Sequence, residues 1–340
     1  MKHRTLMISF LCVMAMVGTF CVPSAFSQAQ TFKLTYSHFW PVGHQVTESL
    51  AEWAKEIEKR TNGRVKTVMF PGGTLTPADK CYDGVVKGIS TVCSSALSYT
   101  RGRFPLMEVS DLPLGYKTAL AAAKLSNAVY KKFQPKELDD VKVMFFHATG
   151  PTILHTKKPV RKLEDLKGMK IRTTGLGAKI ITALGATPVA MPMGDTYDAL
   201  SKGVVEGSTA PIASLEGFKW GEVVKYTTEN FGTAFTTVFF VVMNKKVWNS
   251  MPPDIQKTIE QVNEEWVEKI GKIWDKYDQA GRNFTLKLGN TIIPLSKEED
   301  ARWAKKVRTT LDDYVKVTNA KNLPGNEVLN FSLDYLKKIQ

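Results

Sequence analysis

The chain has 340 residues, 46 lysines and arginines against 33 aspartates and glutamates, and a formal net charge of +13. This length suggests about two domains, and 43% hydrophobic with 23% charged residues is typical of a folded globular protein rather than a disordered one. Four cysteines are too few for a disulfide scaffold, and 24 glycines without a regular period exclude a collagen-like chain. The excess of positive charge raises nucleic acid as a partner to be tested against the sequence.

The N-terminus has the pattern of a secretory signal peptide. Lys2 and Arg4 precede an apolar run over 6–22, and small residues follow up to Ser27. We therefore predict a signal peptide over residues 1–27, with cleavage two residues later or retention as a membrane anchor as the alternatives. The segment carries two positive charges and no negative one, so its removal leaves 313 residues with a net charge of +11. The remainder has no apolar run of about 18 residues, so we do not expect the mature protein to be embedded in a membrane.

Two cysteines remain in the mature chain. Cys81 and Cys93 are twelve positions apart, whereas the other two cysteines lie in the predicted signal peptide. An even pair in an exported protein predicts a disulfide, and two buried free thiols are the alternative.

Short apolar runs alternate with amphipathic stretches, which predicts an α/β fold. In chain order the first elements are a strand at 32–37, a helix at 46–60, a strand at 65–70, a helix at 77–87 and a strand at 92–97. A second series comprises strands at 141–146 and 152–156, a helical turn at 163–167, a strand at 169–173, a helix at 178–184, a strand at 187–190, a helix at 196–202 and strands at 207–210 and 236–243.

The last third of the chain is helical by its periodicity. Residues 254–288 place apolar residues on one side of a helix much longer than the usual 8 to 20 residues, so we expect this helix to bridge two lobes. Two more helices are predicted at 297–319 and 326–338.

No catalytic or cofactor-binding motif is present. The four mature histidines (His38, His44, His147 and His155) have spacings that do not match a common zinc site, and no nucleophile elbow, P-loop or CxxC occurs. Gly175-Leu176-Gly177 resembles the start of a dinucleotide fingerprint, but Ile180 replaces the third glycine, and an anion at the helix N-terminus is the better use of this geometry. We therefore predict no enzyme activity, no cofactor and no metal.

The positive charge is spread along the chain. Lysine pairs such as Lys305-Lys306 lie close to acidic residues at 298–300, as on solvated helix faces, and no basic run interleaves with aromatic residues. These features predict that nucleic acid is not a partner.

One segment points to a known family. Residues 166–174, LKGMKIRTT, resemble the DLKGxKIR signature of DctP-type solute-binding proteins of TRAP (tripartite ATP-independent periplasmic) transporters. Supporting segments follow the family's order, FPGGTL at 70–75, DTYDAL at 195–200, GVVEG at 203–207 and VMNKKVW at 242–248. The resemblance spans about residues 32 to 335.

The resemblance implies a two-lobed periplasmic binding protein fold with crossing hinge strands and a long helix that spans both lobes. We place lobe I at 28–149 plus 238–277 and lobe II at 150–237 plus 278–340. In the family, the arginine of the KIR motif binds the ligand carboxylate, which here is Arg172. The chemistry agrees, because a guanidinium and a carboxylate match as two parallel charge-assisted hydrogen bonds. The alternative is an ordinary surface arginine at a strand end.

The other pocket positions depart from family members that bind sugar acids. Ala210 stands where those members carry an asparagine that contacts the ligand, and Thr152 stands near the place of a second arginine in some of them. The loop after the first strand is rich in aromatic residues, Phe39 and Trp40 among them, and packing between the lobes is their alternative role. One carboxylate-binding arginine with an aromatic rim favours an aromatic monocarboxylate such as an indole or phenyl carboxylate, with a short 2-oxo or 2-hydroxy acid second.

The remaining candidates are chosen by their place at strand ends or in the family pattern. A hydrogen-bonding role is possible for His38 and His44, with a packed core histidine as the alternative. The other candidate pocket residues are Ser95, Ala96, Tyr99, Met193, Tyr197, Thr209, Phe235 and Thr236.

Taken together, the sequence predicts a periplasmic, monomeric receptor that closes on a small organic acid and delivers it to ion-gradient-driven TRAP membrane subunits. The alternatives are the binding protein of an ATP-driven importer and a ligand sensor that uses the same pocket.

Overall fold

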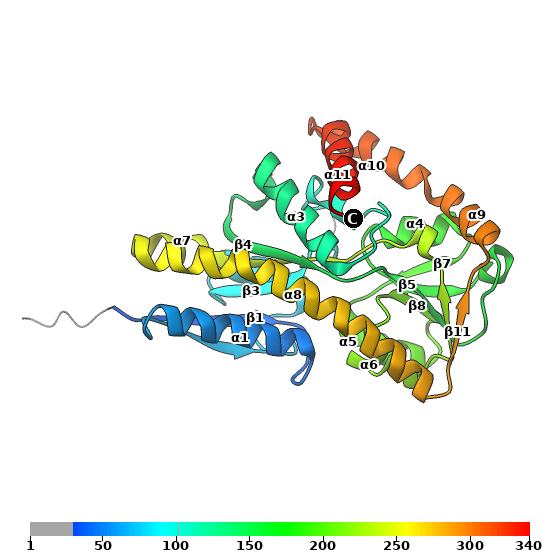
Figure 1. The fold of residues 1–340 in the computed structure, drawn as a ribbon, viewed down its shortest axis with the longest axis horizontal. Helices are drawn as coiled ribbons and strands as arrows, with labels where there is room; N and C mark the ends of the chain where they lie inside the picture. The colour runs from blue at the N-terminus through cyan, green and yellow to red at the C-terminus, as the bar shows by residue number, and fades with distance from the viewer. Residues whose placement is uncertain (1–29, 101) are drawn as a thin grey trace, which may run out of the picture. The chain divides into compact units, whose positions relative to one another are not determined.

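Two separate sheets form the centre of the fold in a computed structural model that describes residues 30–100 and 102–340 (Figure 1). The predicted signal peptide lies outside the described residues. Lobe I is built on a sheet of order β2-β1-β3-β10-β4, and lobe II on a sheet of order β11-β9-β5-β8-β6-β7. The strands are β1 (Phe32–His38), β2 (Val65–Phe70), β3 (Val92–Ala96), β4 (Val141–Ala148), β5 (Ile153–Thr156), β6 (Lys170–Thr173), β7 (Thr187–Ala190), β8 (Gly207–Ala210), β9 (Tyr226–Glu229), β10 (Val238–Asn244) and β11 (Thr291–Pro294).

The β10 strand shows why the lobe I sheet is covered on both faces. Every residue of β10 is buried, and side chains that alternate along a strand point to opposite faces. Phe239 and Val241 pack into the core on one face with α1 and α8, whereas Phe240 and Val242 pack into the core on the other face. The continuous apolar run at 236–243 is therefore a central strand between two cores.

The two lobes are joined by a pair of crossing segments. The chain passes from β4 to β5 through residues 149–152, and it returns from β9 to β10 through 230–237. The two segments lie side by side and antiparallel, because the Thr149 N–H donates to the Thr237 carbonyl at 3.1 Å and the Thr152 N–H donates to the Phe235 carbonyl at 2.7 Å. The predicted lobe boundaries at 149/150 and 237/238 lie in or beside these segments, and the assignment of the lobes stays a prediction.

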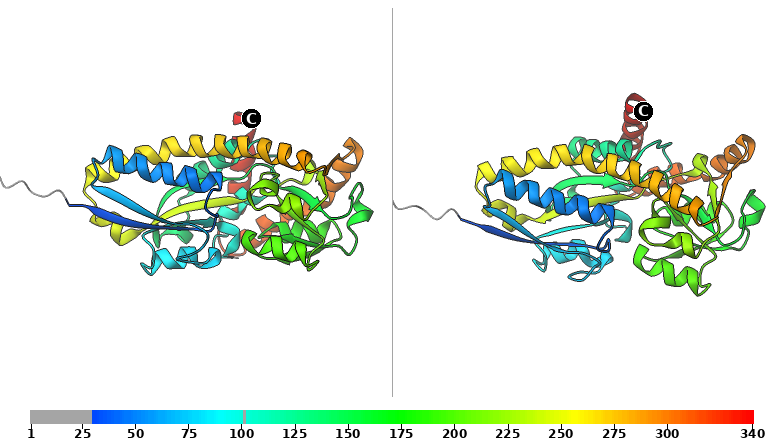
Figure 2. Two further views of the ribbon diagram at one scale, coloured as in Figure 1. Left: turned by 90° about the horizontal axis from the view of Figure 1, so that it is seen from below. Right: turned by 60° about the horizontal axis from the view of Figure 1, so that its bottom comes forward.

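A third connection is the long helix α8 (Pro253–Lys287), which has 35 residues. Pro253 opens it, where a missing N–H costs nothing, and Asp254 in the first turn favours the helix dipole. At a rise of about 1.5 Å per residue the helix is roughly 50 Å long. It lies beside α1 over lobe I and continues along lobe II (Figure 2). The predicted helix at 254–288 is thus found almost residue for residue.

Ten further α-helices lie in the described part of the chain. They are α1 (Gln45–Arg60), α2 (Cys81–Val86), α3 (Ala119–Phe133), α4 (Gly177–Ala183), α5 (Met193–Ser201), α6 (Ser214–Gly217), α7 (Lys245–Ser250), α9 (Lys297–Val307), α10 (Thr309–Asn319) and α11 (Gly325–Ile339). Among the residues that the structure describes, no helix combines the length and the apolar character needed to cross a membrane.

The C-terminal helices correct one boundary. The sequence assigns all of 278–340 to lobe II, but α10 and α11 pack against lobe I. Val328 and Leu336 of α11 join the same core as α3, and the Tyr314 hydroxyl of α10 donates to the Leu106 carbonyl at 2.9 Å. The apolar side of α11 needs a buried partner, and α3, which the sequence analysis does not predict, provides it.

The predicted disulfide is absent from the structure. Cys81 and Cys93 are both buried and free. The Cys81 Sγ lies 3.7 Å from the Ser37 carbonyl oxygen and 3.6 Å from that of Ser94, so its S–H already has acceptors as a thiol. Burial, together with the neighbouring Cys81, raises the pKa of Cys93 and disfavours the thiolate that disulfide formation requires. The pair behaves as core thiols, which is the alternative reading of the sequence.

Gly281 allows α8 to approach lobe II closely. A Cβ atom at this position would lie 2.4 Å from the Ile212 carbonyl oxygen and 2.7 Å from the Ala213 Cα, both of which are backbone atoms. We expect Gly281→Ala to lower the free energy of unfolding by about 1–3 kcal/mol, because the helix and the segment before α6 must separate.

Gly194 is the matched control for this substitution. It also lies in a helix, α5, but a Cβ there would meet no described atom within 4 Å. We expect Gly194→Ala to be neutral or stabilising by less than about 1 kcal/mol, because alanine favours helix. Urea unfolding of both variants checks this, and equal stability changes would contradict the close approach.

Candidate ligand-binding site

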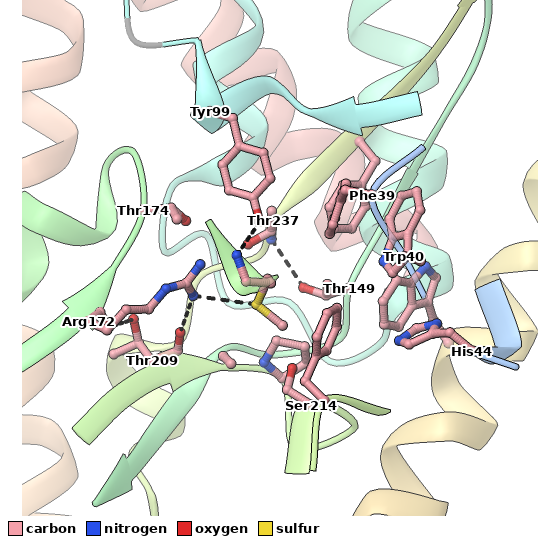
Figure 3. A pocket seen from close by; sticks show the side chains of 16 residues that line it. Phe39, Trp40, His44, Tyr99, Thr149, Arg172, Thr174, Thr209, Ser214 and Thr237 are labelled. Atoms are coloured by element: carbon pink, nitrogen blue, oxygen red, sulfur yellow. Dashed lines mark hydrogen bonds between the residues drawn. The ribbon is translucent and has the colours of Figure 1, made fainter. Parts of the chain in front are cut away.

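A pocket lies between the two lobes beside the crossing segments (Figure 3). It takes in about 420 Å³ when the open space at its mouth is included. Its lining consists of Phe39, Trp40, His44, Tyr99, Thr149, Arg172, Thr174, Met193, Thr209, Ala210, Pro211, Ser214, Phe218, Thr237, Phe239 and Trp274. Eight residues predicted from the sequence are thus brought together here: Phe39, Trp40, His44, Tyr99, Arg172, Met193, Thr209 and Ala210. Their contacts with a ligand stay a prediction.

Arg172 reaches the pocket from β6, an interior strand of the lobe II sheet between β7 and β8. Its guanidinium is held by backbone carbonyls, with Nε and Nη2 donating to the Met191 oxygen at 3.0 and 2.8 Å and Nη1 to the Thr209 oxygen at 3.4 Å. The residue is only 2% exposed. Across 30–100 and 102–340, no carboxylate lies within 4.0 Å of it. The pocket therefore contains a rigidly held cation with no anionic partner from the described chain.

Burial determines the electrostatics of Arg172. Loss of solvent lowers the pKa of the guanidinium, whereas the nearby Tyr99 and the more distant Asp195 raise it. An arginine keeps its proton in such a setting, because its ordinary pKa is above 12. A buried charge without a partner is unfavourable until an anion joins it. The site is therefore suited to a carboxylate, which accepts two parallel hydrogen bonds from the guanidinium.

The other end of the pocket is aromatic. The rings of Phe39 and Trp40 lie 4.2 Å apart, and Trp40 meets Phe239 edge to face at 4.9 Å. Phe239 in turn stacks on Trp274 of α8, with 7° between the ring planes. His147 lies behind this layer and accepts the Trp274 indole N–H at 3.1 Å, which fixes the indole in place. These contacts give the pocket a preformed apolar wall.

His44 joins this wall from the start of α1. Its Nδ1 accepts the Val46 N–H at 3.2 Å and so caps the helix. Since Nδ1 is an acceptor, the neutral ring carries its proton on Nε2. Burial, and to a smaller extent His38, lowers the pKa of His44 to about 3.

We expect His44 to remain neutral throughout the range pH 8 to 5. Long-range 1H–15N NMR correlations of the histidine rings check this. The His44 signal is assigned by its loss in His44→Asn, a variant that should stay folded because asparagine also caps helices. The Nδ1 resonance should be that of an unprotonated acceptor, and it should not titrate in this range. In urea the same signal should titrate near 6.5. A folded-state midpoint near 6.5 would contradict the buried, capped ring.

Seven predicted residues do not line this pocket. They are His38, Ser95, Ala96, Thr152, Tyr197, Phe235 and Thr236. Three of them are turned away by hydrogen bonds: Ser95 Oγ donates to the Ala78 carbonyl, Thr236 Oγ1 to the Thr149 carbonyl, and the Tyr197 hydroxyl to the Glu222 carboxylate.

The positions of the other four are determined by the sheets and by the crossing segments. His38 lies on the same face of β1 as Tyr36, because alternate strand residues share a face, and it is fully buried with a pKa lowered to about 4 by burial. Ala96 is core. Thr152 and Phe235 pair in the crossing segments and line a separate lobe II cavity.

The sequence analysis misses half of the lining. Phe239 and Trp274 belong to a predicted strand and to the predicted long helix, but periodicity alone does not separate a core residue from a pocket wall. Ser214 begins α6, a short helix without a strong sequence signal, and Phe218 directly follows this helix. Thr149 and Thr237 flank the crossing, and their position at the predicted lobe boundary is the signal that points to them.

The profile of the DctP family, described as bacterial extracellular solute-binding protein, family 7, matches residues 36–317. A solved TRAP periplasmic solute-binding protein from Desulfovibrio salexigens is 33% identical, with a TM-score of 0.81 and coverage of 91% of this chain and 97% of that one. A TRAP solute-binding protein from Rhodoferax ferrireducens, solved with copurified benzoate, is 27% identical with a TM-score of 0.86 and coverage of 91% and 98%.

A third structure, from a marine metagenome, is a TRAP solute-binding protein specific for aromatic acid ligands, solved with 3-hydroxybenzoate. It is 28% identical, with a TM-score of 0.86 and coverage of 91% of this chain and 99% of that one. The predicted α/β fold with two lobes is confirmed by these likenesses, and the family consists of binding receptors rather than enzymes. The chain belongs to bacterial extracellular solute-binding protein family 7, the DctP family, and is a solute receptor of the TRAP type.

Proposed function

We propose that this receptor binds an aromatic monocarboxylate between its lobes and delivers it to ion-gradient-driven TRAP membrane subunits. The observation that carries the proposal is Arg172, a buried guanidinium without a carboxylate partner in the described chain, which faces an aromatic wall. A planar ring with one carboxylate matches both ends of the pocket at once.

The polar content of the lining favours an aromatic acid over a sugar acid. A sugar acid carries several hydroxyls, and each loses free energy if it is buried without a partner. Among residues 30–100 and 102–340, no amide side chain and no charged side chain other than Arg172 lines the pocket. The hydroxyls of Thr149 and Thr209 are already bonded, to the Gly150 carbonyl at 2.9 Å and to the Thr173 hydroxyl at 2.8 Å. Ala210, also in the lining, offers no side-chain hydrogen bond.

The relatives with aromatic acids support this choice. The protein from Rhodoferax ferrireducens was solved with benzoate and the marine protein with 3-hydroxybenzoate, and both superpose on this chain over about nine-tenths of its length. A short 2-oxo or 2-hydroxy acid is the second candidate, since it keeps the carboxylate but fills less of the apolar wall.

A thermal-shift screen of the mature protein tests the proposal. The acids are benzoate, 3-hydroxybenzoate, mandelate and indole-3-acetate, set against pyruvate, lactate and glucuronate. A ligand at 100 times its dissociation constant stabilises the folded state by about 2.7 kcal/mol, enough to raise Tm by several degrees. We expect the aromatic acids to give the largest shifts.

Benzamide is the matched control, because it keeps the ring and removes the carboxylate. We expect benzamide to give no shift at concentrations where benzoate saturates the protein. Stabilisation by glucuronate alone, or equal stabilisation by benzamide and benzoate, would show that this interpretation of the pocket is wrong.

We further propose that the mature protein is a periplasmic monomer released by cleavage after residue 27. The signal-peptide pattern of residues 1–27 and the family support export. The positive charge is spread along the sequence beside acidic residues, which supports the proposal that nucleic acid is not a partner. The N-terminal sequence of the secreted protein and its molar mass by light scattering test these two points.

A further inference from the structure

Lobe I contacts the Arg172 end of the pocket through the 3-10 turn Leu97–Tyr99, which follows β3. The Tyr99 hydroxyl accepts the N–H of Met193, the first residue of α5 in lobe II, at 3.1 Å (Figure 3). Next to it, a Cβ at Gly175 would lie 2.6 Å from the Cβ of Ser98, so the loop after β6 touches the same turn. The two lobes therefore meet at this turn, directly beside the buried guanidinium.

The hydrogen bonding of Tyr99 is incomplete. A phenolic hydroxyl donates one hydrogen bond and accepts others. Both polar neighbours of its oxygen, the Met193 N–H and the Arg172 guanidinium, are donors. The phenolic proton thus meets no acceptor in the described part of the chain. Burial raises the pKa of Tyr99, so the hydroxyl keeps this proton and remains able to donate it.

A carboxylate on Arg172 supplies the missing acceptor. The guanidinium belongs to lobe II and the phenol to lobe I, so a carboxylate oxygen between them accepts from both lobes at once. Hydrogen bonds to an ionised acceptor are stronger than those between neutral groups. We propose that Tyr99 is the latch of this receptor, a residue that couples closure of lobe I to the presence of the ligand carboxylate on Arg172.

This inference rests on the proposed function and adds how the pocket closes. A ligand shifts a protein toward the closed form only by the difference between its affinities for the closed and open forms. Arg172 and its supporting carbonyls lie on lobe II and are present in both forms. The Tyr99 contact exists only when lobe I has arrived, so it contributes to that difference.

The test compares Tyr99→Phe with the wild type in stopped-flow binding of benzoate and in small-angle X-ray scattering. We expect the variant to raise the dissociation rate about 10- to 100-fold, with the association rate changed less, since the removed hydrogen bond has an ionised acceptor. We also expect saturating benzoate to compact the wild type more than the variant.

Tyr116→Phe is the matched control. Its hydroxyl is also buried and donates to a backbone carbonyl, that of Ser110 at 2.8 Å, but both residues belong to lobe I. We expect this variant to lose stability as Tyr99→Phe does while keeping the wild-type dissociation rate. If the role of Tyr99 were purely structural, Tyr99→Phe would lower the stability in the same way but would close as fully as the wild type at saturating benzoate.

The outcomes separate the latch from the proposed function. If Tyr99→Phe binds and closes like the wild type, the latch is overturned and the proposed function stands. If the wild type binds neither benzoate nor mandelate, the proposed function fails and the latch fails with it. A slower association with an unchanged dissociation rate would also overturn the latch.

Discussion

Replacing Arg172 with alanine is expected to weaken the binding of benzoate by a factor of 100 or more. The substitution removes two charge-assisted hydrogen bonds, each worth about 1.5–3 kcal/mol, and tenfold in affinity corresponds to about 1.4 kcal/mol. Arg172→Lys should recover only part of this loss, because lysine keeps the charge but lacks the planar pair of donors. Isothermal titration calorimetry of both variants measures the effect.

Arg308 provides the control for this series. It is an exposed arginine between α9 and α10, away from the pocket lining. Arg308→Ala removes the same charge from the protein, so it tests whether the diffuse positive charge alone attracts the anion. We expect wild-type affinity for Arg308→Ala. Full affinity in Arg172→Lys would remove the guanidinium from its assigned role.

Trp40→Ala is expected to have the second-largest effect, because it acts on both the core and the pocket. Trp40 is 1% exposed and packs against Phe39, His147 and Phe239. Truncation of a buried tryptophan costs about 3–5 kcal/mol, a large share of the stability of a typical domain. The same change opens the apolar wall, so benzoate binding to the folded variant should also weaken.

Trp303→Ala separates these two effects. Trp303 is equally buried, but it belongs to the lobe II core and lines the separate cavity there instead of the pocket that contains Arg172. We expect a comparable loss of stability in urea unfolding with the benzoate affinity of the folded fraction unchanged. Equal losses of affinity in both variants would indicate that the effect reports stability and not a pocket wall.

Long periodic elements could be predicted from the sequence. The helix predicted at 254–288 corresponds to α8 (Pro253–Lys287), and the strand predicted at 236–243 covers all of β10 except Asn244. In each case the burial of one stripe or of both faces leaves a regular pattern in the sequence. The contact of α11 with lobe I could not be predicted. This contact depends on α3, whose alanine-rich sequence gives a weak periodic signal. It also depends on the return of the C-terminal part of the chain from lobe II to lobe I.

The pocket was predictable at its ends and not at its centre. Arg172 was found through its motif, and Phe39 and Trp40 through the loop in which they occur. His38 does not line the pocket, because alternation along β1 turns it to the side of Tyr36. Trp274 could not be assigned to the pocket from the sequence, because a helix that spans both lobes presents one apolar face to the core and to the pocket alike. Whether an apolar helix residue packs in the core or lines the pocket depends on how the two lobes come together and not on residue spacing.

The most direct test of the central claim is a crystal structure of the mature protein grown with benzoate. We expect a carboxylate paired with the Arg172 guanidinium in two parallel hydrogen bonds of about 2.7–2.9 Å, with the ring against Phe39 and Trp40. Benzoate bound with its carboxylate away from Arg172, or bound outside the pocket between the lobes, would contradict it.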